Sequence, residues 1–248
     1  MNRRILLNCD MGESFGAWNM GDDALAMPLV DQANLACGFH AADPLTMQRT
    51  VALAVRYGVS IGAHPAYPDL VGFGRRHMAC SPEEVTAQVL YQIGALDAFC
   101  RAAGTQLAYV KPHGALYNDL VRDDALLGAV LEACASYRKG LPLMVLALVD
   151  NRRELEFADA ADVPLIFEAF ADRAYLTDGQ LAPRRLADAL HRDPQRILDQ
   201  ALAIAQGEAF ADIDGKPLQL CADSLCVHGD NPESLAVLRR LRALLDAT

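Results

Sequence analysis

Four of the six histidines in this 248-residue chain stand where an apolar run gives way to glycine and polar residues. They are His40, His64, His113 and His228. Imidazole can transfer a proton near neutral pH or bind a metal, although a single histidine in such a place is more often structural. Four of them in equivalent places predict that at least two line a pocket. The other two, His77 and His191, are expected on the surface.

Two carboxylates stand at the end of the first apolar run. Asp10 and Glu13 follow residues 5–7 and are three residues apart across a glycine. Such a pair can activate water or move a proton, although it could also cap the next element. Lys111 follows a later apolar run. A lysine there could hold a substrate carboxylate or an oxyanion, or pair with Asp10 or Glu168.

Other polar residues near the same run ends are candidates for substrate binding. They are Asn8, His40, Tyr67, Arg75, Tyr117, Asn118, Glu168 and His228. Arg75 follows Gly-Phe-Gly and could hold an acidic ligand or simply be solvated. Arg173 lies close to Glu168 and Asp172, so we expect these three to form an ion-pair network that braces the site.

A metal centre is a second interpretation of the same residues. One aspartate and two or three histidines would suit zinc with a water in the open position. The histidines come singly from separate segments, and no H-x-x-x-H or H-E-x-x-H spacing places two on one helix face. We therefore assign no metal ligands and leave a metal open. Cys9 and Cys37 lie near the site, and we expect them to be small buried residues rather than nucleophiles.

The elements that would position these residues alternate along the chain. Strands are predicted at 4–9, 31–37, 60–64, 107–112, 141–148, 165–170 and 224–227. Helices are predicted at 43–57, 81–104, 122–138, 151–160, 193–207 and 232–245, with an extra hairpin at 209–220. This alternation indicates a parallel sheet, and without a Gly-rich phosphate fingerprint it favours a closed barrel in one domain, 1–248. Polar side chains at the carboxyl ends of its strands would share one site.

Composition narrows the class of partner and the location. Hydrophobic residues make up 52% of the chain and the net charge is −10. A large core is therefore expected, and nucleic acid or an anionic membrane surface is not expected as a partner. Seven cysteines without a C-x-x-C pair, no apolar run of membrane-spanning length and no signal-peptide pattern predict a cytoplasmic protein.

Several long motifs resemble one known family. They are residues 7–16, 34–41, 63–69 with 72–76, 110–118, 170–175 and 226–230. In these stretches the chain is similar to the LamB/YcsF family, also described as the A subunit of 5-oxoprolinase. The resemblance implies an α/β fold, a seven-stranded (β/α) TIM-like barrel of the glycoside hydrolase/deacetylase type. It also implies a bacterial enzyme that converts 5-oxo-L-proline to L-glutamate with ATP hydrolysis, in a complex with subunits B and C.

The sequence has no G-x-x-x-x-G-K-[ST] loop, so ATP would be a co-substrate bound mainly by the partner subunits. We expect the partners to phosphorylate the lactam oxygen and this chain to open the activated ring with water. Asp10 or Glu13 would be the general base. His64 or His113 would protonate the leaving nitrogen.

Lys111 and His40 would hold the substrate carboxylate or the developing oxyanion. Two other functions stay open at this point. One is a metal-dependent deacetylase or amidohydrolase that acts alone, and the other is a non-catalytic subunit that presents a ligand to its partners. Association into a homo-oligomer is open as well, because the outer helices of barrels commonly form such interfaces.

Overall fold

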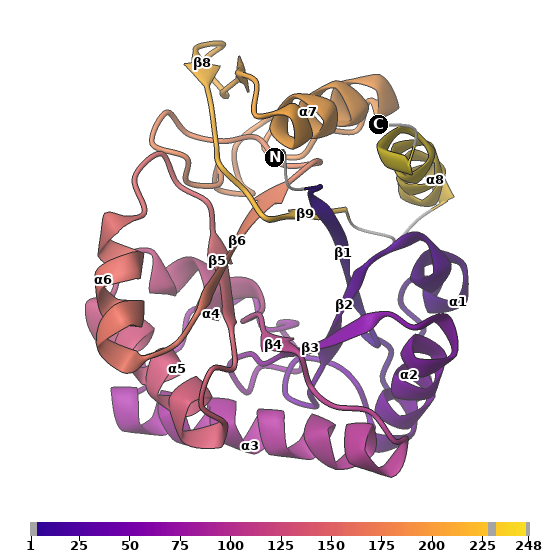
Figure 1. Cartoon of the computed structure of the whole chain (residues 1–248), viewed down its shortest axis with the longest axis vertical. Coiled ribbons are helices and arrows are strands. Elements are labelled where there is room, and N and C mark those ends of the chain that lie inside the picture. Colours follow the sequence, from indigo (N-terminus) through magenta and orange to yellow (C-terminus); the bar gives the residue numbers. More distant parts are fainter. Residues whose placement is uncertain (1–3, 228–231, 247–248) are drawn as a thin grey trace.

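The computed structural model describes residues 4–227 and 232–246. Seven parallel strands close into a barrel in the order β1-β2-β3-β4-β5-β6-β9, and Figure 1 looks along its bore. They are β1 (Leu6–Met11), β2 (Gln32–Ala36), β3 (Ser60–His64), β4 (Tyr109–Val110), β5 (Leu143–Leu146), β6 (Leu165–Phe170) and β9 (Ser224–Cys226). All seven predicted strands and the seven-stranded (β/α) TIM-like barrel are confirmed.

Helices surround the strands (Figure 1). They are α1 (Asp23–Ala26), the short 3-10 helix η1 (Met27–Leu29), α2 (Pro44–Tyr57), α3 (Pro82–Ala102), α4 (Gly114–Leu120), α5 (Asp124–Tyr137), α6 (Arg152–Ala161), α7 (Pro194–Gln206) and α8 (Pro232–Asp246). All six predicted helices are present as α2, α3, α5, α6, α7 and α8. The sequence did not predict α1, η1 or α4, because helices of so few residues show too little periodicity.

The signals that start and stop the long helices act as expected. The Asp43 carboxylate accepts the backbone N–H of Leu45 and of Thr46 at the start of α2, and Gly58 ends that helix with φ 68°. Ser81 and Glu84 form a capping box at the start of α3. These local contacts satisfy backbone groups that a helix end would otherwise leave without partners.

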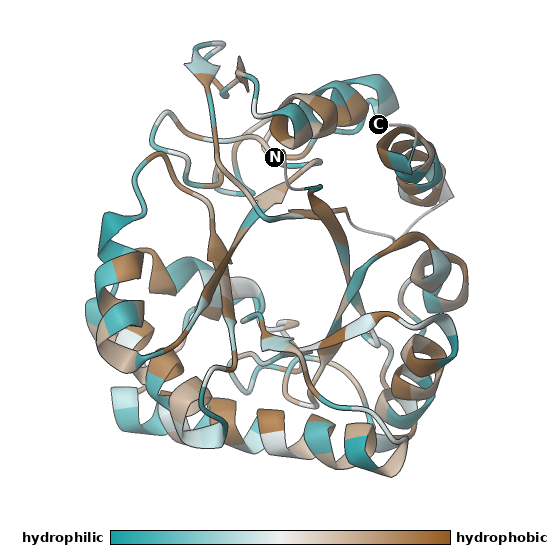
Figure 2. Ribbon diagram, viewed as in Figure 1, coloured by the Kyte–Doolittle hydropathy of each residue, from teal (hydrophilic) through white to brown (hydrophobic). Residues whose placement is uncertain are grey.

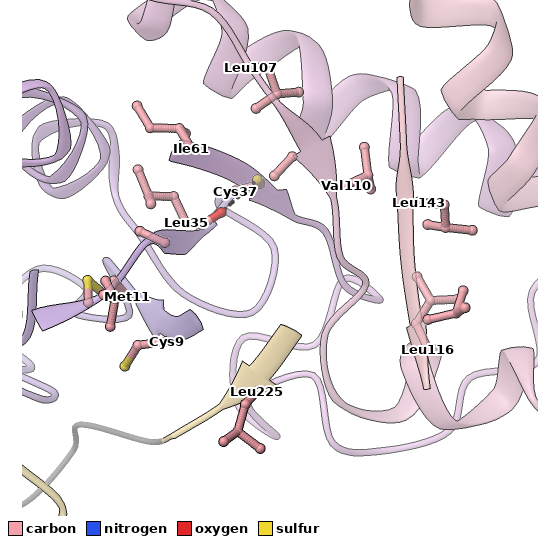
Figure 3. Packing of buried hydrophobic residues seen from close by; sticks show 14 of the residues in the cluster. Cys9, Met11, Leu35, Cys37, Ile61, Leu107, Val110, Leu116, Leu143 and Leu225 are labelled. Carbon is pink, nitrogen blue, oxygen red and sulfur yellow. Dashed lines mark hydrogen bonds between the residues drawn. The ribbon is translucent and has the colours of Figure 1, made fainter. Parts of the chain in front are cut away.

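Each barrel strand has two faces with different chemistry. In β1, Leu7, Cys9 and Met11 are buried in the apolar layer between strands and helices, and Figure 3 shows Cys9 and Met11 within this layer. Asn8 and Asp10 alternate with them and join the polar network of the bore. Figure 2 shows the matching pattern on the helices, whose apolar residues gather toward the strands.

The remaining elements agree with the sequence as well. β7 (Phe210–Ala211) and β8 (Pro217–Leu218) form the predicted antiparallel hairpin outside the barrel. The barrel takes in strands from β1 to β9, as one domain would, and the single domain over 1–248 stays a prediction. Among residues 4–227 and 232–246, no helix has both the length and the apolar character needed to cross a membrane.

Candidate active site

A cavity of about 340 Å³ opens at the carboxyl ends of the barrel strands. Eight predicted site residues line it: Asp10, Glu13, His64, Arg75, Lys111, His113, Tyr117 and Asn118. These residues come from β1, β3 and the segments that follow β1, β3 and β4. The closed barrel brings distant parts of the sequence together at one end, as the predicted fold required.

The first polar group at the cavity is the lysine cluster, which consists of Lys111, Asn8, Asp10, Tyr117 and Glu168. Lys111 Nζ lies 2.9 Å from Asp10 Oδ1 and 2.7 Å from Glu168 Oε1. It also donates to Asn8 Oδ1 at 3.3 Å, and the Tyr117 hydroxyl donates to Glu168 Oε2 at 2.8 Å. One buried ammonium therefore lies between two carboxylates.

Burial by itself lowers the pKa of Lys111, but Asp10, Cys226 and Glu168 outweigh burial and hold that pKa well above its ordinary value. Lys111 is 2% exposed and Glu168 is fully buried. The lysine therefore stays charged, and its charge is committed to its two carboxylates. This resolves the alternatives for Lys111 in favour of an ion pair with both Asp10 and Glu168.

A ladder of amides anchors the lysine cluster in the bore. Asn34 Nδ2 donates to both Asn8 Oδ1 and Asp10 Oδ1 at 2.8 Å. Asn8 Nδ2 donates to Ser224 Oγ, and the Tyr109 hydroxyl donates to Asn34 Oδ1. These bonds fix the orientation of Asp10 at the floor of the cavity.

The second polar group is the histidine cluster, which consists of Glu13, His40, His64 and His113. His64 Nδ1 lies 2.7 Å from the Lys111 carbonyl, and His113 Nε2 lies 2.9 Å from the Phe73 carbonyl. A carbonyl only accepts, so each of these nitrogens carries its ring proton. The other two nitrogens, His64 Nε2 and His113 Nδ1, lie 2.9 Å apart.

His40 lies behind this pair rather than on the cavity wall. Its ring stacks on that of His113 with centroids 3.8 Å apart, and its Nε2 lies 3.3 Å from Glu13 Oε1. Burial, followed by His64, holds the pKa of His40 well below its ordinary value. Burial, followed by His40 and then His64, does the same to the pKa of His113. Both rings are therefore neutral at neutral pH.

Oxygen atoms complete the cluster. Glu13 Oε1 lies 3.5 Å from His113 Nδ1, and Asp10 Oδ2 lies 3.3 Å from His64 Nε2. One ligand atom from each of Glu13, His40, His64 and His113 falls within 4.8 Å of the others, close enough for these residues to hold a metal ion. The site thus offers two carboxylates for proton transfer and a compact set of nitrogen and oxygen donors.

Two glycines permit this packing. Gly74 has φ 65°, and a Cβ there would lie 2.9 Å from atoms of His113 and His40. Gly114 has φ 59°, and a Cβ there would meet the Gly74 carbonyl oxygen at 2.4 Å. The loop after β3 and the start of α4 therefore approach each other as only glycine allows.

Comparison with known proteins decides the family. The model described as "LamB/YcsF family" matches residues 5–248. The chain belongs to the LamB/YcsF family. It is 82% identical over 245 residues to the 5-oxoprolinase A subunit 3 of Pseudomonas aeruginosa, covering 99% of this chain and 98% of that protein. It is 59% identical to the 5-oxoprolinase A subunit 2 of Pseudomonas putida, covering 98% and 94%.

A solved structure agrees with this family. The crystal structure of a "Lactam Utilization Protein" from Thermus thermophilus has a TM-score of 0.90 and 45% sequence identity. The match covers 98% of this chain and 96% of that one. The barrel of this LamB/YcsF protein is therefore also found in a solved structure.

Other predicted residues of this LamB/YcsF protein lie away from the cavity wall. Asn8 and Glu168 are buried beneath it in the lysine cluster. Tyr67 is also buried, and its hydroxyl donates to Asp119 rather than facing the cavity. His228 lies outside the described residues. Cys9 and Cys37 are buried, and burial raises their pKa values, as expected of small core residues.

The prediction for the two remaining histidines is half wrong. His77 is exposed, as expected, and pairs with Asp119. His191 is 8% exposed and its Nε2 lies 3.1 Å from Gln200 Oε1. Gln200 in turn donates to three backbone carbonyls beyond β6, among them that of Arg173. His191 is buried because it completes this brace, which sequence spacing did not indicate.

The structure also reveals functional residues that the sequence did not single out. Five arginines line the cavity: Arg75, Arg122, Arg173, Arg184 and Arg185. Arg173 was predicted within an ion-pair network, and it donates to the carbonyls of Ala182 and Ala189. Burial lowers its pKa to about 10, so it stays charged. Arg184 and Arg185 stand in an irregular segment, where no periodic pattern marked them.

Proposed function

We propose that this chain is the ring-opening subunit of an ATP-dependent 5-oxoprolinase, a cyclic amide hydrolase that forms L-glutamate from 5-oxo-L-proline with subunits B and C. The names of its relatives support a role in 5-oxoprolinase. In this proposal ATP is a co-substrate of the complex. The partner subunits use it to phosphorylate the lactam oxygen, and this barrel then opens the activated ring.

The observation that carries the proposal is the charge of the cavity mouth. The chain has a net charge of −10, yet five arginines gather on the wall of one cavity. Four of them, Arg75, Arg122, Arg184 and Arg185, are exposed. Guanidinium groups bind carboxylates and phosphates with matched geometry. A phosphorylated 5-oxoproline carries both anions, so this wall suits it.

Asp10 is the general base in this proposal. It lines the cavity, and Lys111 and Asn34 hold its Oδ1 in place. The carboxylate takes a proton from water as the water oxygen bonds to the ring carbon. It then passes the proton to the ring nitrogen as the C–N bond breaks.

The proton-donating step goes to Asp10 rather than to a histidine because of the ring tautomers. The inner nitrogens of His64 and His113 carry lone pairs, since their outer nitrogens donate to carbonyls. Neither ring has a proton to offer toward the cavity. His40 lies outside the cavity lining, so it positions Glu13 and does not contact the substrate.

The test measures glutamate release from 5-oxo-L-proline and ATP by purified subunits B and C, with and without this chain. Release is expected only with the chain. Asp10→Asn is expected to lower the rate at least about 100-fold, because it removes general acid–base catalysis. Asp159→Asn, on the exposed side of α6, is the matched control and should keep the wild-type rate.

Two outcomes would overturn the proposal: full activity of B and C without the chain, or unchanged activity of a folded Asp10→Asn variant. Strong turnover by the isolated chain would refute the division of labour among subunits. Hydrolysis of acetylated sugars by the isolated chain would favour the deacetylase function instead. The cytoplasmic location and a homo-oligomer stay predictions.

A further inference from the structure

The histidine cluster places two lone pairs against each other. His64 Nε2 and His113 Nδ1 are 2.9 Å apart, and both outer nitrogens already donate to carbonyls. With those tautomers no ring proton is left for the contact between them. Two buried acceptors facing each other repel unless something positive lies beside both.

We propose that the histidine cluster binds one divalent transition-metal ion through His64 Nε2, His113 Nδ1 and a carboxylate oxygen of Glu13. All three residues line the cavity, so the ion would face the substrate space. Two histidines and one glutamate are a donor set that zinc accepts, with its remaining position open. The site therefore fits zinc better than calcium or magnesium, which prefer oxygen ligands.

The distances between donors support this assignment. Zinc holds nitrogen and oxygen ligands at about 2.0–2.1 Å, so neighbouring ligands of a tetrahedral ion are roughly 3.3 Å apart. The His64–His113 contact is 2.9 Å, and Glu13 Oε1 lies 3.5 Å from His113 Nδ1. The donors thus stand at the spacing of atoms that share an ion, with only small adjustment.

The surroundings of the donors are those of metal ligands. A histidine that binds a metal usually donates its other ring proton to a carbonyl or carboxylate, which fixes its tautomer and orientation. His64 does so to the Lys111 carbonyl, and His113 does so to the Phe73 carbonyl. Glu13 has an equivalent support, since His40 Nε2 lies 3.3 Å from its Oε1.

His40 belongs to this supporting layer rather than to the ligand set. Its ring is parallel to that of His113, with an angle of 4° between the planes and centroids 3.8 Å apart. Two stacked imidazoles cannot both direct a ring lone pair in-plane at one ion. His40 Nδ1 is buried and, within the described residues, has no hydrogen-bond partner, which is consistent with a neutral ring that donates through Nε2.

The test is direct metal binding by the isolated chain after it has been stripped with a chelator. Zinc retained after gel filtration is measured by mass spectrometry, and Co²⁺ is titrated while visible absorption is recorded. The expected result is one equivalent of Zn²⁺ per chain, with Co²⁺ binding at the same site. X-ray absorption of the zinc-loaded chain should show nitrogen and oxygen ligands that include two imidazoles.

Variants separate ligands from bystanders. His64→Gln, His113→Gln and Glu13→Gln should each weaken Zn²⁺ binding at least about 100-fold, and His40→Gln should weaken it roughly 10- to 100-fold. His77→Gln is the matched control, because His77 also forms a histidine–carboxylate pair, with Asp119, but on the surface. It should bind zinc like wild type.

Less than stoichiometric Zn²⁺ and Co²⁺ binding by the folded wild-type chain would overturn the proposal. So would sulfur ligands in the absorption spectrum, since seven cysteines could bind zinc elsewhere. Unchanged affinity in the folded Glu13→Gln variant, which alters one charge and little volume, would also contradict it. The proposal goes beyond the ring-opening function and does not rest on it, because no partner subunit, ATP or 5-oxoproline enters the measurement.

Discussion

The lysine cluster and the histidine cluster share one cavity and treat burial in opposite ways. In the lysine cluster, an ammonium lies within 2.9 Å of two carboxylates. In the histidine cluster, neutral rings direct lone pairs at one another. The two clusters meet at Lys111, whose side chain belongs to the first and whose carbonyl accepts a hydrogen bond from His64 of the second.

This difference separates what holds the site from what the site can bind. A buried charge is tolerated when its partner is part of the fold, as Lys111 is for Asp10 and Glu168. The histidine cluster has donor atoms directed at one point and draws its support from backbone carbonyls. Stability should therefore depend mainly on the first cluster, and ligand binding on the second.

The largest effect is expected when the lysine cluster loses its cation. Lys111→Met leaves Asp10 and Glu168 buried without their ammonium, so the free energy of unfolding should fall by about 3–5 kcal/mol, measured by urea denaturation. Zinc binding by the folded fraction should persist, because His64 uses the backbone carbonyl of residue 111.

Two further variants control this result. Adding Glu168→Gln to Lys111→Met should recover about 0.5–3 kcal/mol, because one uncompensated carboxylate is removed. Lys139→Met breaks an exposed pair with Asp162 and should leave stability nearly unchanged. If Lys111→Met is no more destabilising than Lys139→Met, the lysine cluster does not hold the fold.

An intermediate effect is expected from a methyl group placed against the histidine cluster. Gly74→Ala would bring a Cβ within 2.9 Å of His113 and His40 at φ 65°, so it should cost about 1–3 kcal/mol by overpacking beyond the backbone strain. It should also weaken zinc binding. Gly58→Ala is the control, since Gly58 has φ 68° with open space around it and isolates the backbone term. Equal losses in the two variants would refute the overpacking.

The sequence predicted the framework of this site well. Alternating apolar runs and helix signals placed all seven strands, and the change from apolar to polar residues marked eight residues that line the cavity. Each of these signals is local, because a strand or a cap is determined largely by its own few residues. The barrel then brings the marked ends together without further information.

Contacts between distant segments could not be predicted in the same way. The separation of Asp10 from Glu13 into two clusters depends on which side chain each one meets across the bore. His191 became buried through Gln200, and Arg184 and Arg185 reach the cavity from an irregular segment. No periodicity or spacing encodes such pairings, so only the assembled structure shows them.

The smallest effect concerns Asp23, a carboxylate near both clusters that accepts hydrogen bonds from the N–H of Gly12 and the hydroxyl of Thr50. Burial outweighs these two hydrogen bonds and raises its pKa to about 6, against 3.8 ordinarily. Its contribution to stability is thus fully present below about pH 4 and is lost as pH rises through about 6. Asp23→Asn should match wild type near pH 4 and exceed it by about 1–3 kcal/mol at pH 7, measured by urea denaturation.

The Asp43 carboxylate provides the opposite case and so the control for Asp23. Hydrogen bonds from Gly16, Thr46 and Leu45 lower its pKa to about 2, so its stabilisation is present above pH 4 and is lost as pH falls toward 2. Asp43→Asn should therefore be less stable than wild type at pH 7, with the gap closing in acid. If Asp23→Asn followed that same trend, Asp23 would be a stabilising carboxylate like those around Lys111, and burial without a cation would not be what distinguishes it.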